Sequence, residues 1–390
     1  MFEGLDYITL QQYWWFIVSL LGALLVFLLF VQGGQTLIYN LGKTDDERTM
    51  LINSLGRKWE FTFTTLVTFG GAFFASFPLF YSTSFGGAYW VWIAILFAFI
   101  IQAVAYEFRS KPSNVLGKKT FEIFLFINGL LGTVLLGTAV ATFFTGSDFL
   151  VDKMNITNIT GNASNVISQW KGPANGLEAA LNIHNLTLGL AVFFLSRILA
   201  LLYFMNTIAD DNIAKRAKKH LLINTIPFLI FFLSFVTILV LRSGFAYNSE
   251  TQIVSMEAYK YLHNLLQMPL VLILFLVGVV LVLAGIALPL LKFEKFATKG
   301  IWFSGLGTVL TVLALFLIAG YNNTAYYPST YDLQSSLTIQ NSSSSKFTLI
   351  VMSYVSLLVP FVLAYIIGVW RAINNKKIDK AEMNEDSHIY

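Results

Sequence analysis

The chain contains 390 residues, of which 56% are hydrophobic and 12% are charged, and its formal net charge is +4. Soluble domains carry about 25% charged residues, so this composition indicates a protein surrounded by lipid rather than by water. Because the sequence contains no cysteine, disulfides, thiolate-bound metals, thiolate-ligated iron–sulfur clusters and cysteine nucleophiles are excluded.

Nine apolar segments are long enough to cross a bilayer as helices, and together they predict a single polytopic membrane domain. Strands are not expected within these segments because their apolar and polar residues do not alternate. The predicted fold is an all-α integral membrane protein with about nine transmembrane helices. The segments lie near residues 13–39, 59–81, 88–106, 121–145, 183–206, 221–241, 265–290, 301–319 and 347–370, and a tail follows over 371–390.

The basic residues predict the orientation of the chain in the membrane. Most of the 25 Lys and Arg residues lie in the tail and in the loops after the first, third, fifth and seventh segments. The positive-inside rule then places the N-terminus outside and the C-terminus in the cytoplasm. The positive charge is a topology signal, and no nucleic acid is expected as a partner. The outer loops 146–182 and 321–346 contain Asn-x-Ser/Thr sequons, which fit glycosylation or, as we favour, ordinary solvated loops.

The second and third apolar segments form a predicted hairpin with its tip near 82–87. Glu60 and Glu107 are almost equally far from this tip, so both carboxyls are expected at the same depth and the same face. An acid near the hydrocarbon boundary commonly marks a proton or ion path, and burial would raise its pKa. The alternative is that each acid pairs with a nearby base, Arg57, Lys58 or Arg109, and merely anchors a helix end.

Other polar residues in or beside the segments could form a polar path, make helix contacts, pair with an opposite charge or anchor a helix end. Gln32, Gln35 and Gln102 are candidates for a polar path, although polar contacts between helices are favoured for each. Arg197 is the one charge well inside a segment, and pairing with a carbonyl, a partner's acid or a lipid headgroup is favoured over a functional role. Trp59 is interpreted, like Arg109, as an anchor at a helix end.

The four histidines do not indicate a haem site. His184 and His263 lie at the outer ends of predicted helices, while His220 and His388 lie among the cytoplasmic basic residues. Axial ligation of haem usually needs His, Met or Cys at depth within a helix bundle. We therefore expect that this chain ligates no haem and no other metal.

Several spaced motifs carry a family resemblance. They are Gly-Lys-Thr-Asp-Asp-Glu-Arg (42–48), Ile-Asn-Ser (52–54), Trp59 followed by an acid, Gly-Gly-Ala-x-Phe-Ala (70–75), Pro78, Tyr-x-Phe-Arg-Ser-Lys (106–111), Ser-Leu-Thr (336–338), Phe-Thr-Leu (347–349) and Met-Ser (352–353). Together they resemble subunit II of the cytochrome bd quinol oxidases, and the resemblance covers most of the chain.

This resemblance implies a fold of two four-helix bundles plus one peripheral helix. It implies a non-haem-ligating subunit of a quinol:oxygen oxidoreductase in the respiratory chain of the bacterial cytoplasmic membrane. The haem b and haem d of the complex would be bound by subunit I, the heterodimer partner. The resemblance also allows for a structural quinone and for small accessory membrane subunits in the complex. Acids at the positions matching Glu60 and Glu107 have proposed roles in proton uptake in the family.

The chain departs from the family pattern at several of these positions. Gln32 and Gln35 stand where the family commonly has two Asp, Lys58 stands where it has His, and Gln102 stands where it has Arg. Because Gln cannot titrate, a proton path through this region would be rerouted or reduced. The alternative function is a secondary membrane transporter, but such proteins usually show inverted repeats and several polar groups at mid-membrane.

Overall fold

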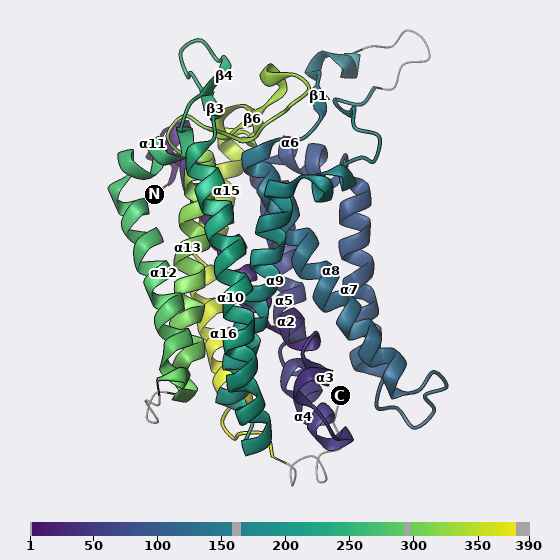
Figure 1. Ribbon diagram of the computed structural model, residues 1–390. Coiled ribbons are helices and arrows are strands. Elements are labelled where there is room, and N and C mark those ends of the chain that lie inside the picture. Colours follow the sequence, from purple (N-terminus) through teal and green to yellow (C-terminus); the bar gives the residue numbers. More distant parts are fainter. Residues whose placement is uncertain (1, 158–164, 292–296, 380–390) are drawn as a thin grey trace.

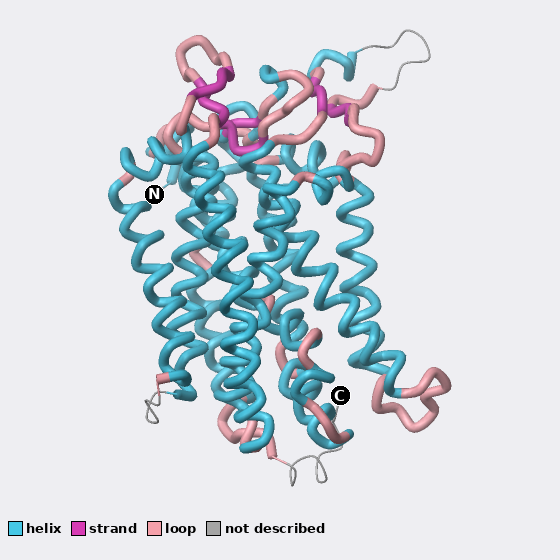
Figure 2. The backbone as a smooth tube through the Cα atoms, viewed as in Figure 1, coloured by secondary structure: helices cyan, strands magenta, loops and turns pink. Residues whose placement is uncertain are grey.

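The computed structural model describes residues 2–157, 165–291 and 297–379. Long helices run side by side through most of the molecule, and short strands and loops cover one end of them (Figures 1 and 2). The helices are α1 Tyr7–Leu28, α2 Phe30–Gln35, α3 Ile38–Leu41, α4 Asp45–Gly56, α5 Trp59–Ser76, α6 Pro78–Phe80, α7 Tyr89–Phe108, α8 Lys118–Thr145, α9 Ile183–Thr207, α10 Asp211–Leu241, α11 Lys260–Gln267, α12 Pro269–Leu290, α13 Gly300–Gly320, α14 Ile339–Ser342, α15 Lys346–Ser356 and α16 Val359–Ile373.

Each of the nine predicted segments contains a helix. Within the described residues, eight helices are long and apolar enough to cross a membrane, and a ninth crossing results if the pair that bends by 117° between Ser76 and Pro78 is one span. The bend follows from Pro78, because proline disfavours helical backbone in the residue before it. Phe77 accordingly leaves the helical region, with φ −132° and ψ 65°, and a π-helical turn over Tyr81–Phe85 follows.

The helices form two groups of four, as predicted. In the first group α1 with its continuation α2 packs beside α5 and α8, and α7 packs beside α8. The second group contains α9, α10, α12 and α13, and contacts of α8 with α9 and of α1 with α13 join the two groups. The pair α15–α16 is peripheral, and α16 has no fully buried residue. Its Trp370 ring lies 4.6 Å from the Nζ of the buried Lys58.

Two of the closest helix contacts depend on glycine. A Cβ built on Gly33 of α2 would lie 2.2 Å from the backbone of Ser196 in α9. A Cβ on Gly285 of α12 would lie 2.5 Å from the carbonyl oxygen of Gly300 at the start of α13. Small residues at these positions let the backbones approach, which is how helices associate where lipid removes a hydrophobic driving force.

The outer loops contain strands that the sequence did not lead us to expect. Three antiparallel pairs form, with β1 joined to β2, β3 to β4 and β5 to β6. Tyr326 and Tyr327 of β5 are buried, and Tyr326 packs 4.4 Å from Trp15 between ring centroids. These loops are therefore a packed cap on the bundle. The strands are β1 Phe149–Val151, β2 Ser168–Trp170, β3 Gly244–Tyr247, β4 Val254–Glu257, β5 Ala325–Tyr327 and β6 Leu337–Thr338.

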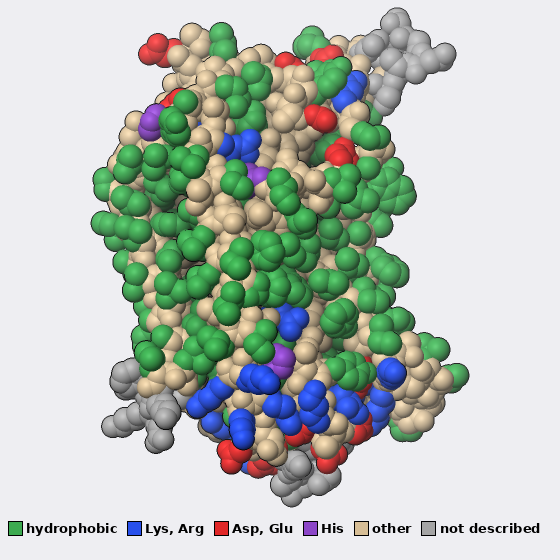
Figure 3. Space-filling view, in the orientation of Figure 1, with side chains coloured by type: hydrophobic (Ala, Val, Ile, Leu, Met, Phe, Trp, Pro, Cys, Tyr) green, Lys and Arg blue, Asp and Glu red, His purple; other side chains and the backbone are tan. Residues whose placement is uncertain are grey.

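The two ends of the molecule differ in charge. Lys and Arg side chains form a band around the end opposite the strands, and hydrophobic side chains cover the middle (Figure 3). The N-terminus lies near the strand-bearing end and the described C-terminal part near the basic end (Figure 1). This agrees with an odd number of crossings. That the basic end faces the cytoplasm remains a prediction.

Candidate functional site

The hairpin brings the two predicted acids to the same end of the molecule. Glu60 is the second residue of α5, and Glu107 lies one residue before the end of α7. Their neighbours Trp59 and Tyr106 stack on each other, with ring centroids 5.9 Å apart and an interplanar angle of 16°. Both acids are therefore near the basic end.

Neither acid is buried. Both Glu60 and Glu107 are exposed, because they lie on the outward faces of their helices. Glu107 forms an ion pair with Lys111 one turn further on, at 3.1 Å, and Glu60 has no hydrogen bond or ion pair within the described part of the chain. Glu107 is therefore paired with a nearby base, as in the anchoring alternative, although that base is Lys111.

Behind the hairpin lies a buried amide cluster, formed by Gln32 of α2, Gln102 of α7 and Asn128 of α8. The Gln32 Nε2 donates to Gln102 Oε1 at 3.2 Å and to Asn128 Oδ1 at 3.4 Å. One turn further along α2, Gln35 donates to the Tyr106 hydroxyl at 3.1 Å. The three amide side chains of the cluster and Gln35 are at most 1% exposed.

The amide groups are only partly satisfied by protein atoms. Two acceptors, Oε1 of Gln32 and of Gln35, and two donors, Nε2 of Gln102 and Nδ2 of Asn128, have no hydrogen-bond partner in the described residues. Buried polar atoms of this kind are commonly satisfied by internal water, and a water molecule can accept from one and donate to another. The cluster can therefore hold water but cannot itself release or accept a proton at ordinary pH.

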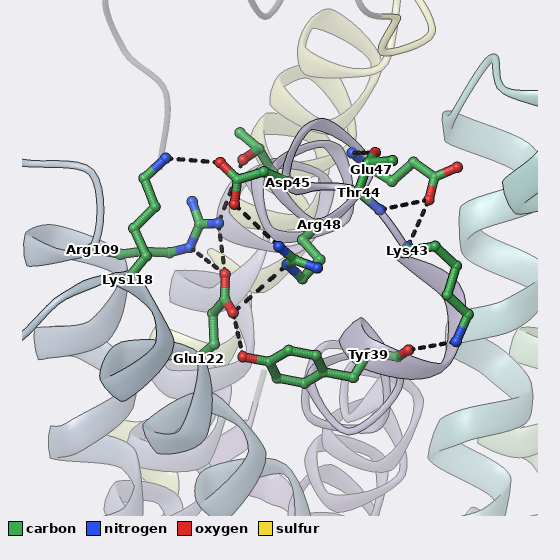
Figure 4. Close-up of polar contacts among 10 residues, drawn as sticks. Tyr39, Lys43, Thr44, Asp45, Glu47, Arg48, Arg109, Lys118 and Glu122 are labelled. Carbon is green, nitrogen blue, oxygen red and sulfur yellow. Dashed lines mark hydrogen bonds and ion pairs between the residues drawn. The ribbon is translucent and has the colours of Figure 1, made fainter.

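A second polar group, the Glu122 cluster, lies nearer the basic end. Figure 4 shows side chains from three segments converging on the Glu122 carboxylate of α8. Arg109 contacts one oxygen through Nη2 at 2.8 Å and Nε at 3.2 Å, and the Tyr39 hydroxyl donates to the other at 2.5 Å. The Nε of Arg48 in α4 lies 3.9 Å from the oxygen that Tyr39 contacts. Arg109 and Glu122 are almost fully buried, so this is a buried ion pair in which two guanidinium nitrogens donate to one carboxylate oxygen.

The motif over residues 42–48 supports this cluster from outside. Thr44 caps α4 and forms a capping box with Glu47, whose carboxylate also binds Arg216 of α10 at 2.6 Å. Asp45 bridges Arg48 at 3.4 Å and Lys118 of α8 at 3.1 Å. The charged motif therefore ties α4 to α8 and α10.

Sequence reasoning missed two central residues, Glu122 and Asn128. Both lie in the apolar segment over 121–145, where an isolated acid or amide was the available signal. Of the predicted anchors, Arg109 is buried against Glu122 and Trp59 stacks on Tyr106. Arg197 has no hydrogen bond or ion pair among the described residues, and its guanidinium lies 5.3 Å from the Phe193 ring centroid.

Two of the described histidines, His184 and His263, make polar contacts near the outer end of the bundle. Both ring nitrogens of His184 are engaged, one 3.2 Å from Arg242 and the other 3.3 Å from the Phe235 carbonyl oxygen. His263 binds Glu257 at 2.8 Å on the outer loop. Burial raises the pKa of Glu257, but the hydrogen bond from His263 and the nearby Lys260 charge outweigh this and lower it below its usual range. His388 lies outside the described residues.

Across the parts of the chain that the structure describes, no group of three or more His, Cys, Asp or Glu could hold a metal ion.

Two apolar cavities lie within the helix groups. The larger, of about 180 Å³, lies among α9, α10, α12 and α13 and is lined almost entirely by apolar side chains. Its only polar lining residues are Thr308 and Thr311, whose hydroxyls donate to their own helix. The smaller, of about 70 Å³, is lined by residues of both groups, including Phe69, Phe143 and Leu188.

Comparison with known proteins places the chain in a family. A model of the cytochrome bd terminal oxidase subunit II family matches residues 10–373. Subunit 2 of the cytochrome bd-I ubiquinol oxidase of Escherichia coli (strain K12) is 26% identical over 400 residues, covering 98% of this chain and 99% of that protein. Subunit 2 of the cytochrome bd ubiquinol oxidase of Bacillus subtilis (strain 168) is 34% identical over 128 residues, or 33% of this chain and 38% of that protein.

The fold has a solved relative as well. A chain in the structure of the bd oxidase from Geobacillus thermodenitrificans superposes with a TM-score of 0.54 at 13% identity, covering 94% of this chain and 98% of that one. The family match over nearly the whole chain and the shared helical architecture agree with each other. The chain belongs to the family of subunit II of the cytochrome bd terminal oxidases, which are respiratory quinol oxidases of the bacterial inner membrane.

Proposed function

We propose that this chain is the subunit of a cytochrome bd oxidase that ligates no haem and braces subunit I. Haem b and haem d are held by subunit I, where quinol is oxidised and oxygen is reduced to water. The observation that carries the proposal is the family match over residues 10–373. It is supported by the engagement of both ring nitrogens of His184, which leaves this buried histidine unavailable as a ligand.

The test is a pull-down of the tagged chain from its native membranes in mild detergent, followed by a dithionite-reduced minus air-oxidised spectrum. Haem b and haem d bands should travel with a larger membrane partner. A folded, colourless chain without a partner would refute the proposal. No observation favours the transporter alternative.

The face of α5 that carries Glu60 is our candidate for the contact with subunit I. Three of its exposed positions in the membrane, Thr64, Thr68 and Gly71, are small and lie beside the larger Val67 and Phe74, whereas the exposed residues of α12 are mostly large and apolar. Small residues on an exposed face suit close helix packing better than contact with lipid. Thr68→Trp should abolish co-purification of the haem-bearing subunit. The matched substitution Ile273→Trp on the lipid-facing side of α12 should not.

We also propose that Glu60 and Glu107 act at the cytoplasmic entrance of a proton-uptake path. Both acids lie at the end of the hairpin that is predicted to face the cytoplasm, and the adjacent Trp59 and Tyr106 link them to the interior through Gln35. Water held by Gln32, Gln35 and Gln102 carries the proton inward, since the amides cannot titrate. Glu60 is the stronger candidate because Glu107 is engaged by Lys111.

The proton proposal is tested with Glu60→Gln, Glu107→Gln and the double variant in the assembled oxidase. Turnover-linked proton uptake should fall while the haem spectrum is preserved. Glu3→Gln is the matched control, because Glu3 is an exposed acid at the opposite end of the molecule. Unchanged uptake in the double variant would assign both acids to anchoring.

The larger cavity is our candidate for the structural quinone. An apolar cavity of about 150 Å³ can bind a benzene-sized ring, so about 180 Å³ can take part of a prenylated quinone. Filling it with Ala191→Phe should lower the quinone content of the extracted complex. An unchanged content would place any quinone elsewhere.

A further inference from the structure

Arg197 presents a charge that the described protein does not neutralise. Its Nε is buried without a hydrogen-bond partner among the described residues, the side chain as a whole is half-buried, and its guanidinium lies 5.3 Å from the Phe193 ring centroid. Even partial desolvation of an unpaired cation is costly. A half-buried guanidinium with donors to spare therefore indicates that an anion from outside the chain contacts it.

The position of Arg197 fits the boundary of the hydrocarbon layer. Helices α9 and α10 are antiparallel and pack along their length. At a rise of 1.5 Å per residue, Arg197 lies roughly 15 Å along the helix axis from the end of α9. His220 lies a similar distance from the start of α10. The two residues are therefore level with each other. The basic stretch that contains Lys219 lies on the cytoplasmic side of them.

The surroundings of His220, which lies level with Arg197, are basic. Among the described residues, the charged groups that act electrostatically on His220 are the cations Arg197, Lys43 and Lys219. Lys43 donates to the Tyr39 carbonyl oxygen at 3.0 Å, which fixes the ammonium beside α3. The nearby Glu47 is engaged by Arg216. We call Arg197, His220 and Lys43 the basic recess.

An apolar stripe leads to this recess from the membrane interior. Leu186, Leu190, Phe194 and Arg197 form the outward stripe of α9, and residues beyond Arg197 on that side, such as Leu201, are buried. Phe194 stacks on Phe231 of α10, with centroids 5.9 Å apart. In Figure 1, α9 lies between α8 and α10. An acyl chain along this stripe would end with its headgroup at Arg197.

We propose that the basic recess binds the phosphate-bearing headgroup of an anionic lipid from the cytoplasmic leaflet, with one acyl chain on the α9 stripe. The Arg fork suits phosphate oxygens, and basic pockets between transmembrane helices on the cytoplasmic side are known lipid sites. The site is separate from the proposed proton path and from the contact with subunit I, so it stands independently of both.

The experiment uses the whole purified oxidase, stripped of lipid and placed in nanodiscs of phosphatidylcholine with or without phosphatidylglycerol. Lipid retained after a detergent wash is counted by mass spectrometry, and the thermal midpoint is recorded. The wild type should retain phosphatidylglycerol in preference to phosphatidylcholine and be stabilised by it. Arg197→Gln should lower that retention by roughly tenfold, the scale of one charge-assisted contact. Lys119→Gln, which removes an exposed charge elsewhere at the same end, should retain it.

Three results would overturn the proposal. Equal retention of both lipids by the wild type would point to an acid from another subunit as the partner of Arg197. Full retention by Arg197→Gln would remove the recess from lipid binding. Equal stabilisation by inorganic phosphate in pure phosphatidylcholine would identify a site for a free anion. If Arg197→Gln fails to assemble, Lys43→Gln, an exposed residue of the same recess, should weaken retention by itself.

Discussion

Replacing Glu122 by Gln tests whether the buried ion pair holds the basic end of the bundle together. The change keeps the shape of the side chain but removes the carboxylate charge that lies 2.8 Å from the buried Arg109 guanidinium. Breaking one side of a buried pair costs about 3–5 kcal/mol. The ion pair of Glu107 with Lys111 is a matched contrast, because both side chains are more than half exposed and such pairs contribute about 0–1 kcal/mol.

The thermal midpoint of the assembled oxidase, scanned at one fixed rate, measures the difference. With about 2 °C per kcal/mol for a chain of this size, Glu122→Gln should lower the midpoint by about 6–10 °C and Glu107→Gln by about 2 °C or less. Arg109→Met alone should be as damaging as Glu122→Gln. The double variant Arg109→Met with Glu122→Leu should recover part of the loss, because apolar replacement of both partners removes both buried charges together. The reasoning fails if Glu122→Gln is no worse than Glu107→Gln.

Two further changes test the helix ends and contacts. Thr44→Ala removes the helix cap whose hydroxyl accepts a hydrogen bond from the Glu47 backbone amide at 3.2 Å. The loss should cost about 1 kcal/mol of stability and lower the thermal midpoint by about 2 °C. An unchanged thermal midpoint would show that the cap contributes nothing to the assembled complex. Gly33→Ala places a Cβ against the backbone of α9 and should reduce the yield of assembled complex severalfold. Gly70→Ala, where the Cβ would meet only a Phe85 ring carbon at 3.5 Å, should assemble normally; equal yields of the two would contradict the close-contact argument.

Much of the architecture was predictable from the sequence. The lengths of the apolar segments predicted the spanning helices, because backbone in lipid must satisfy its own hydrogen bonds. The symmetry of the hairpin about its tip predicted that Glu60 and Glu107 would reach the same end. The spaced motifs predicted the family. The strand pairs of the outer loops could not be predicted in this way, because they depend on tyrosines that pack onto the bundle, as Tyr326 does onto Trp15.

The depth of each acid along its helix was set by the sequence, but the face on which it lies was decided by packing. A soluble helix shows its buried face as an apolar stripe, whereas a helix in lipid is apolar on every side, so its sequence carries little record of which side meets a neighbour. For this reason Glu60 and Glu107 turned out exposed and Glu122 buried. Only the tertiary structure brings Gln32, Gln102 and Asn128 from three helices together and leaves Arg197 without a partner in the described chain.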